Sequence, residues 1–339
     1  MVTFIIFFIY IIINIFIYFN FYKISKIINI YDVPDNHRKL HKAPVSNIGG
    51  LIIFFNIMLV LLLFFIKNNL FNDTIYFNSQ SQFISFFIFI IPLIIIGILD
   101  DKIHLSANVK IMSLAVVLIF ALFIDHDLRI YELRMTFLES GIQLNNFTVL
   151  ITLFSFLLFM NALNMMDGIN LLVGMYSLII FLFFAFYLNI DFIFIFFSIG
   201  LINYLILNFK NKVFLGDNGT ILLSYIISYF FIKSYNYENI FYADQIFLIM
   251  MIPGLDLLRV AVSRISLGSS PFKADRAHLH HLFVKAYNQK VALTCILLMS
   301  IIPFFISLLI IKETLLIIIS VFFIYIASVF LLYRKIKYQ

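Results

Sequence analysis

Residues 83–101 read FISFFIFIIPLIIIGILDD, an apolar run that ends in two aspartates. Wound as an α-helix, a run of this length crosses most of the hydrocarbon core of a bilayer, which is about 30 Å thick. Similar runs recur along the chain of 339 residues, which is 63% hydrophobic and 12% charged, with a mean hydropathy of +1.08. A soluble domain has a much lower apolar content. The sequence therefore predicts a membrane protein with many spans.

We expect an all-α, polytopic fold in one integral membrane domain over residues 1–339, with about eleven transmembrane helices and short loops. The predicted helices cover 3–22, 49–66, 83–99, 109–124, 147–163, 169–188, 192–207, 219–232, 241–262, 291–310 and 314–332. The first has no basic residue ahead of it and no small-residue cleavage site behind it, so we expect it to be retained. The loop 125–146 has mixed charges and suggests a short hairpin or an amphipathic cover.

Lysine and arginine divide unevenly between the two alternating sets of loops. The set that includes 23–48, 208–218 and 263–290 holds roughly 18 basic residues against roughly 5 in the other set, which makes it cytoplasmic. We therefore expect the N-terminus outside and the C-terminus inside. The formal charge of +6 is spread over several short loops, so it reflects topology and predicts no nucleic-acid partner.

Carboxylates gather at the ends of the predicted helices. Asp100 and Asp101 end the third helix, Asp167 follows the fifth, and Asp217 precedes the eighth, all at the cytoplasmic level. An aspartate at membrane depth costs roughly 2.5–3.5 kcal/mol, so a functional reason is expected, although helix capping is the alternative for any one of them. Neighbouring residues of a helix point about 100° apart, so Asp100 and Asp101 are expected to serve different atoms.

Polar and basic groups accompany these aspartates: Lys110, Asn161, Asn164, Lys273, Asp275, Arg276, His278, His280 and His281. The HLHH run at 278–281 has ligand types that suit a transition metal, but adjacent histidine side chains are expected to diverge and no cysteine joins them. A surface cluster without function is another alternative. We prefer a phosphate-binding or proton-handling loop, because an arginine fork binds phosphate oxygens. Carboxylates with basic groups suit Mg²⁺-assisted phosphoryl transfer, since this hard cation takes oxygen ligands.

Four motifs carry a resemblance to a known family: GILDD at 97–101, NALNMMDG at 161–168, FLGDNG at 214–219 and PFKADRAHLHH at 271–281. With the loop 32–50, they make nearly the whole chain resemble the polyprenyl-phosphate N-acetylhexosamine-1-phosphate transferases of glycosyltransferase family 4. The ADRAHLHH form resembles the branch that starts lipopolysaccharide O-antigen, enterobacterial common antigen or teichoic-acid linkage units, with UDP-GlcNAc or a related UDP-N-acetylhexosamine. It is less similar to the branch that makes the first lipid of peptidoglycan.

The resemblance implies an enzyme of the bacterial cytoplasmic membrane whose active site faces the cytoplasm. It would transfer an N-acetylhexosamine 1-phosphate from the UDP-sugar to undecaprenyl phosphate and release UMP, and GlcNAc 1-phosphate is the sugar phosphate that we expect. The product would prime cell-surface polysaccharide synthesis. The implied cofactor is Mg²⁺, with Mn²⁺ as the alternative, and the implied assembly is a homodimer in the lipid bilayer. A phospho-MurNAc-pentapeptide transferase is one alternative. A transporter with cation-binding aspartates is the alternative from another class, although the charged groups gather at one face and no inverted repeat is visible.

Carried over residue by residue, the resemblance implies Asp100, Asp101 and Asp217 as catalytic residues, and Asp217 with Asn164 as metal ligands. The implied substrate-binding residues are Lys110, Asn161, Asn164, Asp167, Asn208, Phe214, Arg276, His278, His280 and His281. Among them, Asp167 and Phe214 are expected to contact the uridine, and Arg276 with the histidines to contact the diphosphate and the sugar. The chain departs from the family pattern at Ser46, Asn47, Leu171 and Asn218, with His41 and Lys42 as basic substitutes.

Overall fold

The computed structural model describes residues 2–34, 43–66, 77, 79–188, 191–240, 242–272 and 275–338. These residues contain twelve α-helices and two small antiparallel sheets of two strands each. Each of the eleven predicted helices coincides with an observed helix, and the all-α prediction is confirmed. The short helix α10 (Leu279–Ala286) was not predicted. It falls inside a polar loop, and its few residues are too short a stretch for a membrane-length pattern to reveal.

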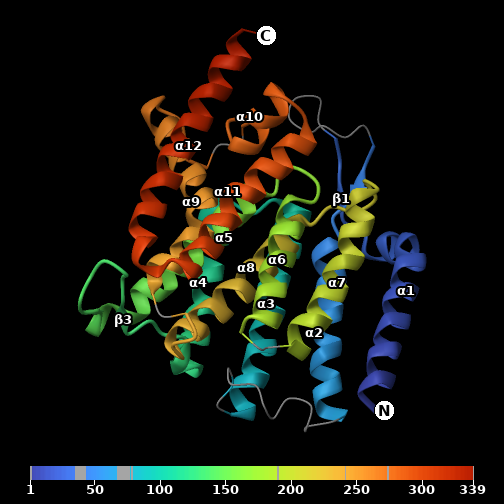
Figure 1. The fold of residues 1–339 in the computed structure, drawn as a ribbon. Helices are drawn as coiled ribbons and strands as arrows, with labels where there is room; N and C mark the ends of the chain where they lie inside the picture. Colours follow the sequence, from blue (N-terminus) through green and yellow to red (C-terminus); the bar gives the residue numbers. More distant parts are fainter. Residues whose placement is uncertain are drawn as a thin grey trace. The chain divides into compact units, whose positions relative to one another are not determined.

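The chain packs as two compact units, Met1–His126 with Val173–Phe230, and Asp127–Leu172 with Phe231–Gln339. Unit 1 contains α1 (Val2–Ile28), α2 (Gly49–Ile66), α3 (Gln80–Ile103), α4 (Ala107–Ile124), α6 (Leu172–Phe186), α7 (Asp191–Phe209) and the strands β1 (Tyr31–Asp32) and β2 (Val45–Ser46). Unit 2 contains α5 (Thr148–Met166), α9 (Ala243–Ser266), α10, α11 (Gln289–Leu309), α12 (Thr314–Lys337) and the strands β3 (Glu132–Leu133) and β4 (Ile142–Gln143). The helix α8 (Gly216–Asn236) begins in unit 1 and ends in unit 2 (Figure 1).

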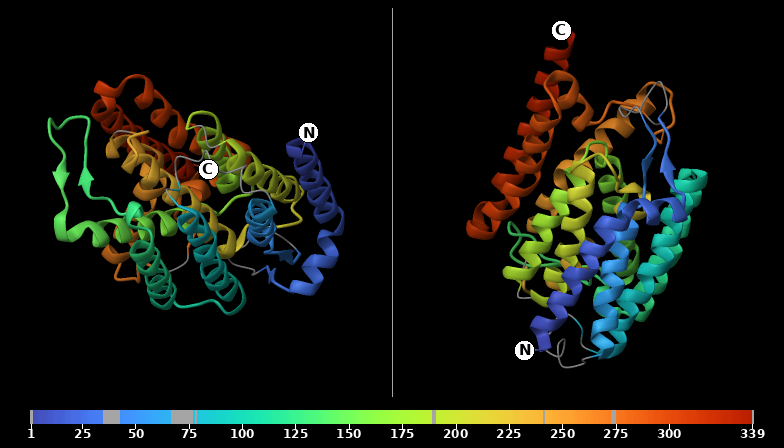
Figure 2. Two further views of the ribbon diagram at one scale, coloured as in Figure 1. Left: turned by 90° about the horizontal axis from the view of Figure 1, so that it is seen from below. Right: turned by 90° about the vertical axis from the view of Figure 1, so that its right-hand side faces the viewer.

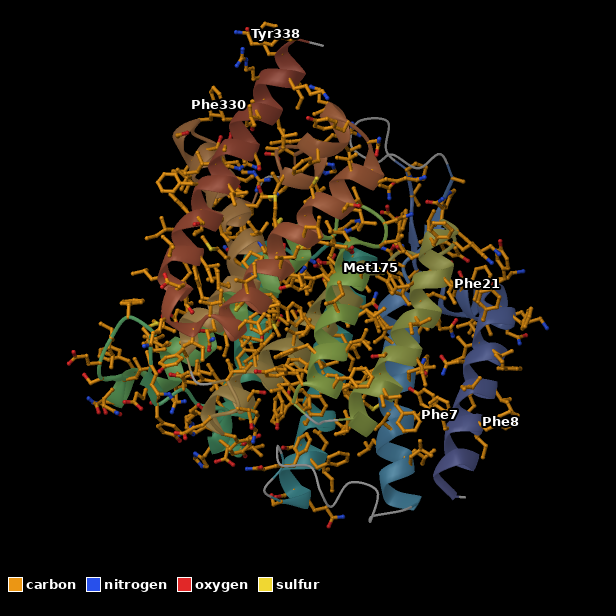
Figure 3. The ribbon with its side chains drawn as sticks, viewed as in Figure 1. Phe7, Phe8, Phe21, Met175, Phe330 and Tyr338 are labelled. Carbon is orange, nitrogen blue, oxygen red and sulfur yellow. The ribbon has the colours of Figure 1, made fainter. Side chains whose placement is uncertain are left out.

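Seven of the described helices are long and apolar enough to cross a membrane: α1, α3, α4, α5, α9, α11 and α12. The helices α2, α6 and α7 are apolar but shorter, and the eleven-span count itself stays a prediction. Large apolar side chains face outward, as Phe8 on α1 and Phe330 on α12 do, each 64% exposed (Figure 3). Such surfaces are stable in hydrocarbon, and the chain is a polytopic membrane protein.

A buried polar cluster holds α1 against α2 and α7 in unit 1. Asn14 Nδ2 donates to Asn56 Oδ1 at 2.7 Å, and Asn203 Nδ2 donates to the backbone and side-chain oxygens of Asn14 at 2.9 and 3.1 Å. The Tyr10 hydroxyl donates to the Asn56 carbonyl at 3.0 Å. Hydrogen bonds between membrane helices contribute about 0.6–2 kcal/mol each. They fix these three helices side by side (Figure 2).

In unit 2, α9 packs against α5 and α11, and the short α10 lies on α11 and α12. Gln245 Nε2 on α9 donates to the Ser307 carbonyl on α11 at 2.9 Å. The loop before α5 forms the hairpin of β3 and β4, in which Glu132 pairs with Gln143. The predicted short hairpin in 125–146 is therefore confirmed.

Candidate active site

Lys110 on α4 joins two carboxylates in unit 1. Its ammonium lies 2.6 Å from Asp100 Oδ2 and also contacts Asp217 Oδ1 at hydrogen-bond range. Asp100 lies near the end of α3, and its Oδ1 accepts the backbone N–H of Leu105 at 2.9 Å, which closes the turn into α4. The Lys110 side chain is 13% exposed, against 10% for Asp100 and 29% for Asp217. This partial burial strengthens the attraction relative to that in bulk water.

Asp101 has different partners, as expected from the divergence of neighbouring helical residues. Its Oδ1 accepts the backbone N–H of Asp217 at 3.0 Å, and its Oδ2 accepts that of Asn218 at 3.1 Å. Asn47 Nδ2 adds a third hydrogen bond to Oδ1 at 3.2 Å. The carboxylate thus caps the N-terminus of α8, where free N–H groups and the helix dipole favour an anion. Asp101 thereby positions the first turn of α8, which carries Asp217.

Glycines allow the helix ends to meet this closely. A Cβ at Gly97 on α3 would lie 2.3 Å from Asn218 Cα, and a Cβ at Gly50 on α2 would lie 2.4 Å from Gly219 Cα. Gly216 has a φ of +74°, a left-handed conformation that glycine adopts without steric cost. The motifs GILDD and FLGDNG, separated by more than a hundred residues, are therefore in direct contact.

Asn208 and Phe214 build the loop that leads into α8. Asn208 is buried, and its Nδ2 donates to the Val213 carbonyl at 2.8 Å. The Phe214 N–H donates to the Ser46 carbonyl at 2.9 Å, and its carbonyl accepts the Gly49 N–H at 3.0 Å. These contacts give both residues a structural role, and their predicted contact with substrate stays a prediction.

Three of the departures from the family pattern belong to one hydrogen-bonded group. Asn218 Nδ2 donates to the Asn47 carbonyl at 2.9 Å, and the Asn47 amide bonds Asp101. Ser46 precedes Asn47 and pairs with Tyr31 across the small sheet. His41, Lys42 and Lys273 lie outside the described residues.

In unit 2, the first histidine of the HLHH run contacts a buried aspartate that was not among the predicted site residues. Asp256 on α9 is 8% exposed, and its Oδ2 lies 2.9 Å from His278 Nδ1. The Leu279 N–H donates to Asp256 Oδ2 at 3.0 Å and to Oδ1 at 3.2 Å. Asp256 Oδ1 also accepts hydrogen bonds from the Tyr325 hydroxyl at 3.0 Å and from Arg259 Nη2 at 2.7 Å. The signal in the sequence was an aspartate and an arginine three residues apart inside an apolar helix.

His278 is in contact through both ring nitrogens. Its Nε2 lies 3.4 Å from Arg264 Nη2, while Nδ1 faces Asp256. Arg264 also donates to Asp275 Oδ2 at 2.9 Å and to the Pro271 carbonyl. The hydrogen bond from Arg264 holds the pKa of the Asp275 carboxyl below its usual value. These contacts fix the segment that leads into α10.

His280 and His281 lie beside the His278 ring. The rings of His278 and His280 are parallel with centroids 5.8 Å apart, and those of His280 and His281 are 4.1 Å apart and tilted by 56°. The expectation that the adjacent rings diverge is wrong, because side-chain rotations bring them together although their Cβ directions differ by about 100°. Burial lowers the pKa of His280 well below its usual value, and that of His281 to about 4.

His280 also contacts the turn that ends α5. A Cβ at Gly168 would lie 1.9 Å from His280 Nε2, so glycine leaves the space that this ring occupies. Among the described residues, that nitrogen is buried without a hydrogen-bond partner. Asp167 forms the C-cap of α5, with its N–H 3.2 Å from the Asn164 carbonyl.

Two other predicted site residues belong to unit 2, Asn161 and Arg276. Asn161 Nδ2 donates to the Leu157 carbonyl on α5 at 2.7 Å, and Arg276 is exposed. The structure thus brings Asp100, Asp101, Lys110 and Asp217 together in unit 1, and the Asp167 turn together with the histidine run in unit 2. Asn164 and Asp217 belong to different units. Their joint binding of a metal stays a prediction.

Comparison with known proteins identifies the family. The sequence model of glycosyl transferase family 4 matches residues 83–235, a range that includes the whole unit 1 cluster. Over this range the chain is similar to glycosyl transferase family 4. The predicted family is confirmed, and the match to this glycosyl transferase family also covers Asn161, Asn164 and Asp167.

Curated relatives agree with this family and with the predicted branch. The undecaprenyl-phosphate alpha-N-acetylglucosaminyl 1-phosphate transferase of Salmonella typhi is 27% identical over 276 residues, which cover 78% of this chain and 71% of the relative. The protein of the same name from Escherichia coli K12 has the same identity and coverage. A probable undecaprenyl-phosphate N-acetylglucosaminyl 1-phosphate transferase of Bacillus subtilis is 28% identical over 323 residues, 91% of this chain and 84% of the relative.

Proposed function

We propose that the protein transfers an N-acetylhexosamine 1-phosphate from its UDP-sugar to undecaprenyl phosphate, and so primes the synthesis of a cell-surface polysaccharide. The sugar phosphate that we propose is GlcNAc 1-phosphate. The observation that carries this proposal is the cluster of Asp100, Asp101, Asp217 and Lys110 at the ends of apolar helices. A site at that level serves an acceptor in the bilayer and a donor in water. The names of the relatives support the same sugar phosphate and the same acceptor.

We propose Mg²⁺ as the cofactor, with Mn²⁺ as the alternative. Among the described residues, no three Asp, Glu, His or Cys side chains are arranged to hold an ion by themselves, so substrate phosphates would have to complete the ligand set. The carboxylate cluster offers oxygen ligands, and the side-chain oxygens of Asn47 and Asn218 are buried there without hydrogen-bond partners in the described chain. Mg²⁺ takes oxygen ligands from one or two carboxylates and from substrate phosphates. We propose Asp217 as the first metal ligand, because it is the more exposed of the two described carboxylates that Lys110 contacts. We propose Asn164 as the second metal ligand. When bound, the ion would neutralise charge on the donor diphosphate.

The reaction that we propose is attack by an acceptor phosphate oxygen on the sugar-linked phosphorus of the donor. The bond from that phosphorus to the bridging oxygen breaks, UMP leaves, and the lipid ends in a diphosphate-linked sugar. A phosphate monoester has its second pKa near 6 and is largely a dianion at pH 7, so little general-base help is needed. Positioning and charge neutralisation, to which Lys110 contributes, should therefore dominate the rate.

A panel assay tests the proposal. Purified protein is incubated with undecaprenyl phosphate, Mg²⁺ and, separately, UDP-GlcNAc, other UDP-N-acetylhexosamines and UDP-MurNAc-pentapeptide, and the lipid and nucleotide products are identified by mass spectrometry. We expect UMP and a lipid diphosphate sugar, with unchanged configuration at the anomeric carbon. Release of UDP would contradict the mechanism, and a preference for the pentapeptide donor would assign the peptidoglycan alternative. Absence of transfer with every donor would leave the transporter alternative.

We also propose that the site faces the bacterial cytoplasm, with the N-terminus outside and the protein acting as a homodimer. The basic-residue asymmetry supports the orientation. The background for this test is a variant in which Cys295, the single cysteine of the sequence, is replaced by Ser. In intact cells, a cysteine introduced at Asn236 should react with an impermeant thiol reagent, and one at Ser269 should not. Labelling of Ser269→Cys from outside would reverse the orientation.

A further inference from the structure

The hairpin of β3 and β4 in unit 2 has one apolar face and one polar face. Leu133 pairs with Ile142, and Glu132 pairs with Gln143. Residues that pair directly lie on the same face of a hairpin, and successive residues alternate between the two faces. Leu133 and Ile142 therefore belong to the apolar face. Glu132 and Gln143 belong to the polar face, where the Gln143 amide donates to Glu132 Oε1 at 2.9 Å.

Arg134, which follows β3, ties the hairpin to the connection between α8 and α9. Its guanidinium donates to Glu238 Oε1 at 2.9 Å and to the Tyr235 carbonyl at 2.8 Å. Its backbone N–H donates to the Tyr235 hydroxyl at 2.7 Å, and its carbonyl accepts the Ala243 N–H at 2.8 Å. Because these hydrogen bonds use the backbone as well as the side chain, they hold the hairpin in one position on unit 2.

Further hydrogen bonds hold the two ends of the hairpin segment. Asp244, in the first turn of α9, is buried, and its Oδ2 accepts the backbone N–H of Thr136 at 3.0 Å and also the Thr136 hydroxyl. Asn236 Nδ2 on α8 donates to the Arg129 carbonyl at 2.9 Å, just ahead of the hairpin. The segment is thus bonded to unit 2 before β3 and at the turn, so the fold sets the direction of its apolar face.

These contacts leave apolar side chains of the hairpin uncovered. Tyr131, Phe137 and Ile142 are each 51% exposed, and Leu138 is 39% exposed. In Figure 1 and in the left view of Figure 2, the hairpin stands at the edge of unit 2, and no described helix of that unit lies beyond it. A hairpin in water normally has its apolar face on the core and its polar face outward. The reversed arrangement indicates that the apolar face meets something other than water.

The exposed apolar surface continues from the hairpin onto α5. Phe147, Leu150 and Phe154 are all exposed, and their spacing of three and four residues places them on one side of the helix. The stretch Asn145–Met166 is long and apolar enough to cross a membrane, and it begins directly after the hairpin. Since the exposed side of α5 lies in hydrocarbon, the hairpin lies at the boundary between hydrocarbon and water.

We propose that the apolar face of this hairpin is a lipid anchor that lies in the membrane interface, among the phospholipids of the leaflet at which α5 begins. Tyr131 and Phe137 supply aromatic rings, which concentrate at such interfaces. Glu139 in the turn keeps its carboxylate in water, so the hairpin stays near the headgroups. The anchor holds the start of α5, whose other end carries Asn164 and Asp167, at a fixed level of the bilayer. It is independent of the proposed function.

The sequence contains no tryptophan, so a single introduced tryptophan reports only on its own surroundings. Ile142→Trp places the indole on the apolar face, and Gln143→Trp places it on the polar face at the next residue, which is also exposed. Each variant is reconstituted in phosphatidylcholine nanodiscs, which leave both membrane faces accessible, and its fluorescence is quenched with lipids brominated in the acyl chains or with iodide. We expect Ile142→Trp to emit at shorter wavelength than Gln143→Trp and to lose several times more emission to brominated lipid, with the reverse order for iodide.

Phe137→Trp asks the same question at the turn, so the proposal stays testable if Ile142→Trp does not fold, and thermal unfolding in the nanodiscs checks the folding of each variant. Strong quenching by iodide at both apolar positions would place this face in water and overturn the proposal. Equal quenching of Ile142→Trp and Gln143→Trp by brominated lipid would refute the assignment of the two faces. Shielding from both quenchers only in nanodiscs that hold two protein copies would assign the face to a second copy and also overturn the proposal.

Discussion

The carboxylate cluster of unit 1 and the histidine cluster of unit 2 balance charge in opposite ways. In unit 1, the ammonium of Lys110 contacts two carboxylates, those of Asp100 and Asp217, and a third carboxylate, that of Asp101, accepts only N–H groups of neutral amides among the described residues. In unit 2, a single carboxylate, that of Asp256, accepts hydrogen bonds from four different residues. The first cluster has an excess of negative charge that a bound cation would neutralise. The second is saturated, so it orders the chain around it.

This comparison teaches that a conspicuous motif can be mainly structural in one unit and open to substrate in the other. The HLHH run looks like a ligand-binding loop, but His278 and His280 are buried, with His278 held between Asp256 and Arg264. Arg276 is exposed, and His281 is only partly buried. Within residues 276–281, these two side chains are the most accessible of the predicted ligand-binding residues.

The largest effect should come from the open cluster. Asp217→Asn removes one anionic ligand for the proposed metal and one partner of Lys110, so we expect a loss of turnover of about 1,000-fold, equivalent to several kcal/mol. Turnover is measured with saturating UDP-sugar over a range of Mg²⁺ concentrations, with Glu139→Gln in the exposed hairpin as the control. An Asp217→Asn protein with more than about a tenth of wild-type turnover would remove Asp217 from the metal shell.

Substitutions in the histidine cluster of unit 2 should lower the free energy of unfolding. Asp256→Asn leaves Arg259 without its carboxylate and weakens the hold on His278 and Leu279, so we expect a loss of roughly 3–5 kcal/mol, as for other broken buried ion pairs. The measurement is thermal unfolding in detergent. Asp275→Asn is the matched variant, since its carboxylate is 32% exposed and makes a smaller contribution. Equal destabilisation by both variants would mean that Asp256 does not organise this cluster.

The close approach of α3 to α8 can be tested with two glycines. In Gly97→Ala the new Cβ would lie 2.3 Å from the backbone of Asn218, so we expect a loss of about 1–3 kcal/mol from overpacking. In Gly254→Ala on α9 nothing lies within 4 Å of the new Cβ, and the better helix propensity should stabilise the protein by about 0.5–1 kcal/mol. Unfolding temperatures of both variants are compared with wild type. Equal shifts for the two would show that α3 and α8 are not packed through Gly97.

The buried histidines predict a pH dependence for unit 2. Burial lowers the pKa of His281 to about 4 in the folded protein, below its usual value of about 6.5. The unfolded chain therefore binds a proton first, and this contribution to stability is complete above pH 6.5 and is lost as the pH falls towards 4. We expect His281→Gln to flatten the profile of unfolding temperature between pH 7 and 5. An unchanged slope in that variant would mean that His281 is solvated.

The smallest effect should come from Leu171, one of the positions at which the chain departs from the family pattern. Leu171 has a φ of +72°, and this backbone strain lowers the stability of a protein by about 1–3 kcal/mol when the residue has a side chain. A glycine would relieve the strain, but its greater freedom in the unfolded chain lowers stability by about 0.5–1 kcal/mol. We therefore expect Leu171→Gly to be neutral or to stabilise the protein by up to about 1 kcal/mol. A clear loss of stability on thermal unfolding would show that the leucine side chain has a packing role that outweighs the strain.

Much of the architecture was predictable because membrane helices are encoded locally. An apolar run of sufficient length forms a helix in lipid whatever its neighbours are, so all eleven predicted ranges coincide with helices. The short α10 escaped prediction because its few residues are too short for a membrane-length pattern. The role of Asp256 escaped prediction because two of its partners, His278 and Tyr325, lie far away in the sequence.

The sequence by itself determined the all-α membrane fold, the family, and the expectation that Asp100 and Asp101 point to different atoms. Those properties follow from hydropathy, motif order and helix geometry, which are readable along the chain. Only the tertiary structure decided that Asp101 caps α8, that Lys110 joins Asp100 to Asp217, and that His278 is held by Asp256. Hydrogen bonds and ion pairs act over a few ångströms in space, and the separation of two residues in sequence does not fix the distance between their side chains.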